Sequence, residues 1–148
     1  MIEKYKIKLN KIFKRNKVIL AYLFGSAARE KTGPLSDVDI AVLFSDKVKK
    51  NDYFDKRLKL ASEIDRALGV YKTEVICLNE SPPLLKHEAV FRGILIFAKD
   101  FDSKREFELR VLQEFEDFRY HLETANEIMR KQIKMGTFGK PLISRYSL

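Results

Sequence analysis

The chain has 148 residues, of which 45% are hydrophobic and 34% are charged, and its net charge is +8. This composition fits one compact domain with an apolar core, and it excludes collagen-like, low-complexity and disordered chains. The longest uninterrupted apolar run, at 18–24, is seven residues long, far short of the roughly 20 residues that a membrane-spanning helix needs. We therefore expect a soluble protein with no membrane partner.

Cys77 is the single cysteine of the chain, so it cannot form an internal disulfide. It lies in an apolar run that predicts a buried strand, and no flanking residue marks its thiol as activated. We expect a buried, structural thiol and a reducing, cytoplasmic location.

The positive charge is concentrated at both ends of the chain. Residues 1–17 carry a net charge of +6 and residues 130–148 carry +5, so the remaining residues sum to −3. Basic ends around a near-neutral body suit an anionic partner such as a nucleotide, RNA or an acidic protein face. A solvated helix face and a flexible basic tail at 134–148 are the alternative, because charge alone carries no specificity.

Helices and strands alternate along the first 100 residues. Apolar residues at helical spacing predict an amphipathic helix at 2–14 and another at 52–68, which Gly69 ends. Short apolar runs predict buried strands at 18–24, 38–44, 72–78 and 94–98, with a helical turn at 26–30 and a helix from Pro82 to about Phe91. Strands interleaved with helices indicate one sheet domain, of α/β or α+β class, over residues 1–100.

The segment 101–133 has a different pattern, with apolar residues at steps of 4, 3, 4, 3 and 4. This spacing predicts one long helix with a single apolar stripe, formed by Val111, Phe115, Phe118, Leu122, Ala125 and Met129. The stripe packs either within the chain, on the sheet or the first helix, or on a partner's helix. Packing within the chain is favoured, since two heptads fall short of the three to four that indicate a coiled coil.

The chemistry is concentrated where the first predicted strand meets the next turn of helix. Gly25 ends the strand, and its lack of a side chain lets the backbone approach a ligand closely. Ser26 opens the helical turn, where free backbone amides and its hydroxyl are suited to phosphate oxygens. Arg29 is a further candidate for phosphate binding, with a solvated surface arginine as the alternative.

Asp37 and Asp39 stand two residues apart at the start of the second predicted strand, so their carboxylates project from the same face. Two like charges at this distance repel each other unless a cation lies between them. Ligation by carboxylate oxygens alone favours Mg²⁺ or Mn²⁺, which complete their shell with substrate phosphates and water. A phosphate cradle beside metal-binding carboxylates predicts a nucleotide site.

A third carboxylate would complete a two-metal site of the kind that clamps the attacking and leaving oxygens of an in-line displacement. Glu74 is the candidate, because it enters the third predicted strand as Asp37 enters the second. An exposed glutamate at the end of a strand is the alternative interpretation.

The pattern Gly25-Ser26-x10-Asp37-x-Asp39 resembles the signature of the DNA-polymerase-β-type nucleotidyltransferases. Within that superfamily, residues 24–30 (Phe-Gly-Ser-Ala-Ala-Arg-Glu) and 36–42 (Ser-Asp-Val-Asp-Ile-Ala-Val) are similar to the minimal nucleotidyltransferase (MNT) proteins. The resemblance covers roughly residues 1–133. It implies an α+β nucleotidyltransferase fold, with a small mixed sheet flanked by helices and a long C-terminal helix.

The same resemblance implies roles and partners. Gly25 and Ser26 would hold the triphosphate of ATP, Asp37 and Asp39 would bind two Mg²⁺ ions, and Glu74 would take the third carboxylate position. The family more often has Asp at that third position. Many MNT proteins are antitoxins that transfer AMP from ATP to a tyrosine of a HEPN-domain ribonuclease toxin, which implies a hetero-oligomer.

Two other functions remain open at this point. The chain could neutralise a toxin by binding alone, through the apolar stripe and the basic ends. It could also be a stand-alone nucleotidyltransferase that acts on a small hydroxylated molecule or an RNA 3′ end, with the basic N-terminal helix as an RNA face. The residues alone do not identify the molecule that accepts the nucleotidyl group.

Overall fold

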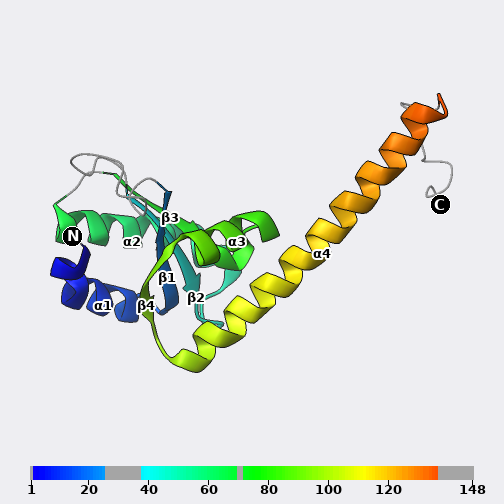
Figure 1. The fold of residues 1–148 in the computed structure, drawn as a ribbon. Coiled ribbons are helices and arrows are strands. Elements are labelled where there is room, and N and C mark those ends of the chain that lie inside the picture. Colours follow the sequence, from blue (N-terminus) through cyan, green and yellow to red (C-terminus); the bar gives the residue numbers. More distant parts are fainter. Residues whose placement is uncertain (1, 26–37, 70–71, 137–148) are drawn as a thin grey trace.

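The computed structural model describes residues 2–25, 38–69 and 72–136 (Figure 1). Its centre is a four-stranded sheet in the order β3-β2-β1-β4. The strands are β1 (Val18–Phe24), β2 (Val38–Phe44), β3 (Thr73–Cys77) and β4 (Ile94–Ala98). β1 is antiparallel to β2 and to β4, whereas β2 and β3 are parallel. The predicted mixed sheet of an α+β fold is therefore confirmed.

One face of the sheet is covered by α1 (Lys6–Arg15), which follows a 3-10 helix at Ile2–Tyr5, and by α2 (Tyr53–Leu68). Each helix presents one apolar stripe to the sheet, as the sequence periodicity predicts. Phe13 of α1 and Leu60 of α2 have no exposed surface and belong to one core cluster with alternate residues of the strands. The buried face of α1 thus leaves its lysines on the solvent side.

The other face carries α3 (Pro83–Arg92) and the first third of α4 (Phe101–Lys134). Phe107 and Val111 are the buried residues of α4, and they pack in a second core cluster with Leu20 and Tyr22 of β1. His87 of α3 stacks on Phe115 of α4, with 3.8 Å between ring centroids. These contacts fix the direction of α4 relative to the sheet.

Most of α4 extends beyond the domain (Figure 1). The helix begins at the end of the sheet where β4 ends, and its 34 residues give it a length of about 51 Å. The apolar stripe is therefore divided: Val111 is buried, whereas Phe118, Leu122 and Met129 are 37%, 49% and 41% exposed. Packing within the chain, the favoured interpretation, holds for the start of the stripe and is wrong for these three residues.

The predicted strands 18–24, 38–44 and 94–98 have the observed bounds. The third strand is one residue shorter at each end than predicted, because Leu78 belongs to a 3-10 turn at Leu78–Glu80. The predicted helical turn at 26–30 lies outside the described residues, as does the basic tail beyond Gly136. Within the described ranges, no helix is both long enough and apolar enough to cross a membrane.

Candidate active site

Gly25 directly follows β1 and adopts a positive φ of 74°, a conformation that residues with a side chain rarely take. A Cβ atom built on Gly25 would lie 2.5 Å from Oδ2 of Asp39. The backbone at Gly25 therefore packs directly against the Asp39 carboxylate. The sequence predicts that this backbone approaches a bound ligand closely. In the structure, the side chain nearest to it is that of Asp39, a candidate metal-binding residue.

Asp39 also lies beside Glu74. It pairs with Phe24 of β1 on one side and with Glu74 of β3 on the other. Register partners on neighbouring strands, about 4.8 Å apart, point to the same face of a sheet. Asp39 is half-buried and Glu74 is exposed. The two carboxylates thus share the face that carries α3 and α4, at the end of the sheet where β1 ends.

Ser26, Arg29 and Asp37 belong to the segment 26–37, which lies outside the described residues. The structure therefore places Gly25, Asp39 and Glu74 together among the six predicted site residues. Over the described ranges, no group of three or more His, Cys, Asp or Glu side chains is arranged to hold a metal ion. The predicted set of three carboxylates needs Asp37 in addition.

The residues present fit a hard divalent cation. Asp39 and Glu74 supply carboxylate oxygens only, and oxygen ligands are those that Mg²⁺ and Mn²⁺ prefer. Because Gly25 has no side chain, Oδ2 of Asp39 fits directly against the backbone at the end of β1. Asp39 and Glu74 are therefore the described residues that would hold the metal.

Two side chains of α2 fix the strand that carries Glu74. The backbone N–H of Thr73 donates a 2.9 Å hydrogen bond to Oδ1 of Asp65, and Nε of Arg57 donates one of 2.9 Å to the Val75 carbonyl. These bonds hold the residues on either side of Glu74. Asp65 and Arg57 were not predicted from the sequence, because a polar residue on a helix gives no signal of the strand it will contact.

Gly93 sets the distance between α3 and the end of β1. A Cβ atom at Gly93 would lie 2.8 Å from the Leu23 carbonyl oxygen and would also overlap the Ala89 carbonyl. Since any larger residue would push these backbones apart, Gly93 allows β4 to start beside Leu23. Gly93 was also not predicted from the sequence, where its signal was a glycine between a predicted helix and a predicted strand.

Cys77 is buried at the end of β3, as predicted. Burial raises the pKa of its thiol, whose sulfur donates a weak hydrogen bond of 3.4 Å to Oδ1 of Asn79. A protonated, buried thiol is a poor nucleophile. The side-chain amide of Asn79 also bonds the backbone N–H and carbonyl of Phe44. Cys77 and Asn79 therefore have a structural role, joining β3 to β2.

Comparison with solved structures shows the same fold in MNT proteins. One is described as a toxin-antitoxin with AMP-PNP; it is 23% identical, with a TM-score of 0.64, and the match covers 87% of this chain and 98% of that one. Another is a tri-AMPylated Shewanella oneidensis HEPN toxin in complex with an MNT antitoxin, with 23% identity, a TM-score of 0.61 and coverage of 90% and 99%.

A third similar structure is described as a putative minimal nucleotidyltransferase; it has 22% identity and a TM-score of 0.50 over 63% of this chain and 90% of that one. No curated protein sequence matches the chain. The sequence profile described as polymerase beta, nucleotidyltransferase matches residues 7–102, a range that includes all six predicted site residues. With its mixed sheet and its paired carboxylates beside Gly25, the chain belongs to the polymerase beta nucleotidyltransferase family.

Proposed function

We propose that this protein is an MNT-type antitoxin that transfers AMP from ATP to a tyrosine hydroxyl of a HEPN-domain ribonuclease and thereby neutralises it. The observation that carries the proposal is the juxtaposition of Gly25, Asp39 and Glu74 at one end of the sheet. Two similar structures support the choice of acceptor and of nucleotide. One contains an AMPylated HEPN toxin with its MNT antitoxin, and another contains AMP-PNP.

The proposed reaction is in-line attack of the tyrosine oxygen on the α-phosphorus of ATP, with diphosphate as the leaving group. Gly25, Ser26 and Arg29 hold the triphosphate, and Asp37, Asp39 and Glu74 hold the metal. Two Mg²⁺ ions, when bound, neutralise the charge that develops on the phosphoryl oxygens. Glu74 is exposed, so an acceptor hydroxyl can reach its carboxylate and give up a proton there.

The distal part of the apolar stripe is the proposed docking surface for the toxin. Phe118, Leu122 and Met129 continue the line of Val111, which packs on the sheet, but they remain exposed in this chain. Both Asp39 and α4 lie on the same face of the sheet, and α4 runs from the opposite end of the sheet past the end with the carboxylates (Figure 1). A helical partner bound along α4 therefore lies on the same side of the sheet as the reaction site, which is the side from which the proposed acceptor approaches.

Intact-mass spectrometry tests this proposal most directly. A HEPN-domain protein encoded by the neighbouring gene is incubated with this protein, ATP and Mg²⁺, and its tyrosines are mapped by peptide analysis. The expected result is a mass gain of one or more AMP units, about 329 Da each, that requires Asp39. A partner that binds this protein stably, yet gains no mass with ATP and either Mg²⁺ or Mn²⁺, contradicts the proposed transfer.

Neutralisation by binding alone is the second candidate, and the exposed part of the stripe favours it because binding needs only that surface. The two candidates differ in their need for the carboxylates. Under the transfer proposal, Asp39→Asn abolishes neutralisation of the toxin's ribonuclease activity, whereas binding alone leaves neutralisation unchanged in that variant. A stand-alone transferase that acts on a small molecule or an RNA 3′ end predicts neither complex formation nor AMP on the toxin.

A further inference from the structure

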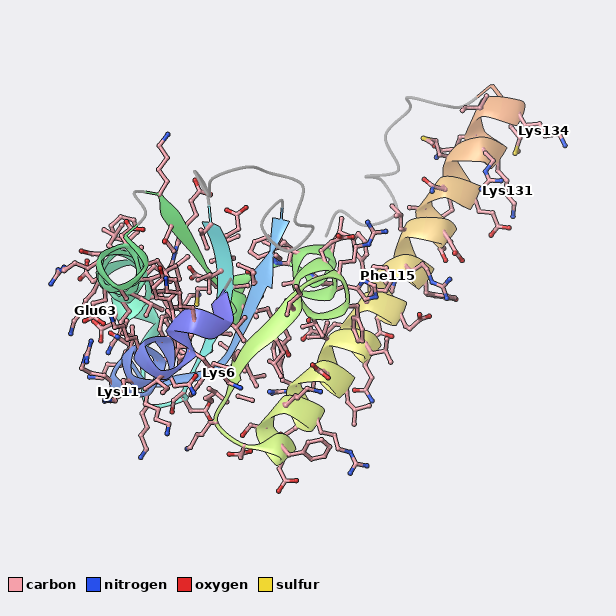
Figure 2. The ribbon with its side chains drawn as sticks, turned by 60° about the vertical axis from the view of Figure 1, so that its left-hand side comes forward. Lys6, Lys11, Glu63, Phe115, Lys131 and Lys134 are labelled. Atoms are coloured by element: carbon pink, nitrogen blue, oxygen red, sulfur yellow. The ribbon has the colours of Figure 1, made fainter. Side chains whose placement is uncertain are left out.

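The solvent side of α1 and its flanking turns is strongly basic (Figure 2). Seven cationic residues occur between positions 4 and 17, without a single acidic residue among them, and every one is exposed. We call this surface the α1 basic face; its residues are Lys4, Lys6, Lys8, Lys11, Lys14, Arg15 and Lys17. Lys6 and Lys11 extend from α1 into solvent in Figure 2. The surface is thus a dense array of positive charge on one short helix.

The fold itself makes little use of these charges. Within the described part of the chain, one of these seven residues forms an ion pair: the guanidinium of Arg15 lies 3.0 Å from the carboxylate of Glu63. Lys8, Lys11 and Lys14 follow one another at intervals of three, where like charges on a helix repel. What holds α1 in place is its apolar side, with Leu9, Ile12 and Phe13 buried.

The composition of the α1 basic face favours nucleic acid over a protein or a membrane as its partner. Protein interfaces have an apolar core from which lysine is depleted. The solvent side of α1 offers a single exposed large apolar residue, Ile7, which is too little for such a core. A helix that binds a membrane surface inserts its apolar side between lipids, whereas the apolar side of α1 is already buried in the domain. Closely spaced lysines without an apolar core suit the phosphodiester backbone of nucleic acid, where they release condensed counterions.

The α1 basic face is also separate from the candidate active site. α1 packs with α2 on one face of the sheet, while Asp39 and Glu74 point to the face that carries α3 and α4. A long polyanion bound at α1 therefore does not need to occupy the nucleotide site. For the same reason, binding at this surface can be measured independently of nucleotidyl transfer.

We propose that the α1 basic face binds the phosphodiester backbone of a nucleic acid without reading its sequence. Lysine ammonium groups act as point charges on phosphates and do not form the paired contacts to base edges that specify sequence. Affinity then depends on the number of phosphates neutralised and falls steeply with salt.

Fluorescence anisotropy with charge-reversal variants tests this proposal. The probes are labelled oligouridine RNA, oligothymidine DNA of the same length, a DNA duplex and poly-glutamate, titrated with the full chain between about 50 and 200 mM salt. The test variant is Lys6→Glu with Lys11→Glu. The matched control is Lys131→Glu with Lys134→Glu on distal α4, which changes the net charge by the same amount (Figure 2).

The expected result is that the α1 variant loses about tenfold or more in affinity for the nucleic acids, while the α4 control loses less than about twofold. Replacing Lys6 and Lys11 with Ala instead should lower the slope of log Kd against log salt by about two. RNA that binds more tightly than both DNA probes would identify RNA as the backbone preferred. Equal losses in both charge-reversal variants, equal affinity for poly-glutamate, or no binding by the wild-type chain would overturn the proposal.

Discussion

The hydroxyl of Tyr22 donates a 2.8 Å hydrogen bond to Oε2 of Glu108, and this bond links the central strand β1 to α4. Lys104 holds the other carboxylate oxygen at 2.9 Å, one turn earlier on the helix. Tyr22 is almost fully buried, with 1% of its surface exposed. The contact therefore anchors α4 on the strand that Gly25 directly follows.

Burial, the hydrogen bond to Glu108 and the charge of that carboxylate raise the pKa of Tyr22 well above its usual range. The folded protein keeps this proton at alkaline pH, whereas the unfolded chain releases it above about pH 10. The free energy of unfolding should therefore fall as pH rises above about 10. Tyr22→Phe should remove this part of the slope and cost about 1 kcal/mol at neutral pH.

Urea unfolding at neutral and alkaline pH measures both effects. Tyr120→Phe is the control, because Tyr120 is 67% exposed on α4, and it should change stability by less than about 0.5 kcal/mol. If the two variants have the same free energy of unfolding at neutral pH, the Tyr22–Glu108 bond does not anchor α4.

Gly25→Ala should affect transfer far more than stability. The positive φ costs about 1 kcal/mol for alanine, and the new Cβ must also displace the Asp39 carboxylate that it would meet at 2.5 Å. Gly69→Ala is a matched control: Gly69 has φ of 69° at the end of α2, and no described residue other than its chain and helix neighbours comes within 4 Å of the Cβ position. We expect similar losses of stability in the two variants, but loss of transfer in Gly25→Ala alone, measured by AMP incorporation and thermal unfolding.

Substitutions that change charge or side-chain length distinguish the role of Glu74 from that of Asp39. Asp39→Asn should lower transfer by about a hundredfold or more with the fold retained, because it removes a metal-binding charge. Glu74→Gln should do the same if Glu74 is the third carboxylate, while Glu74→Asp should keep measurable transfer. Glu80→Gln, at an exposed position shortly after β3, is the control. Wild-type rates in Glu74→Gln would assign the third carboxylate role elsewhere.

The distal stripe of α4 is tested by placing charge on it. Leu122→Glu with Met129→Glu should abolish binding to the HEPN partner in size-exclusion chromatography without changing the melting temperature, since both residues are already exposed. Leu109→Glu with Tyr120→Glu is the control, because these exposed residues lie on the opposite side of the same helix. Equal binding by both double variants would show that the toxin docks elsewhere.

The sequence predicted the strands well and the contacts between elements poorly, for a physical reason. The run Val18–Phe24 is β-branched or aromatic at most positions and Gly25 closes it, so local propensity alone defines that strand. The apolar period of α4 is the same whether the stripe meets its own sheet or another protein. Its division after Phe115 therefore depends on where the domain ends in space.

The same distinction applies to the candidate site. Gly25, Asp39 and Glu74 could be proposed from local patterns, because a glycine that closes a strand and acids near the starts of the next two strands are visible in the sequence alone. That Asp39 would face Glu74 depends on the parallel register of β2 and β3, which no local pattern encodes. The supporting contacts of Asp65 and Gly93 depend on that tertiary arrangement too.

The few anchors of α4 also bear on how such a protein can change over evolutionary time. Phe107 and Val111 are its buried residues, and both lie in its first third. Substitutions beyond Phe115, which stacks on His87, cost the domain little stability, because no residue of α4 after it is buried. Partner choice can therefore diverge along distal α4 by single substitutions, while the residues that do the chemistry stay as they are.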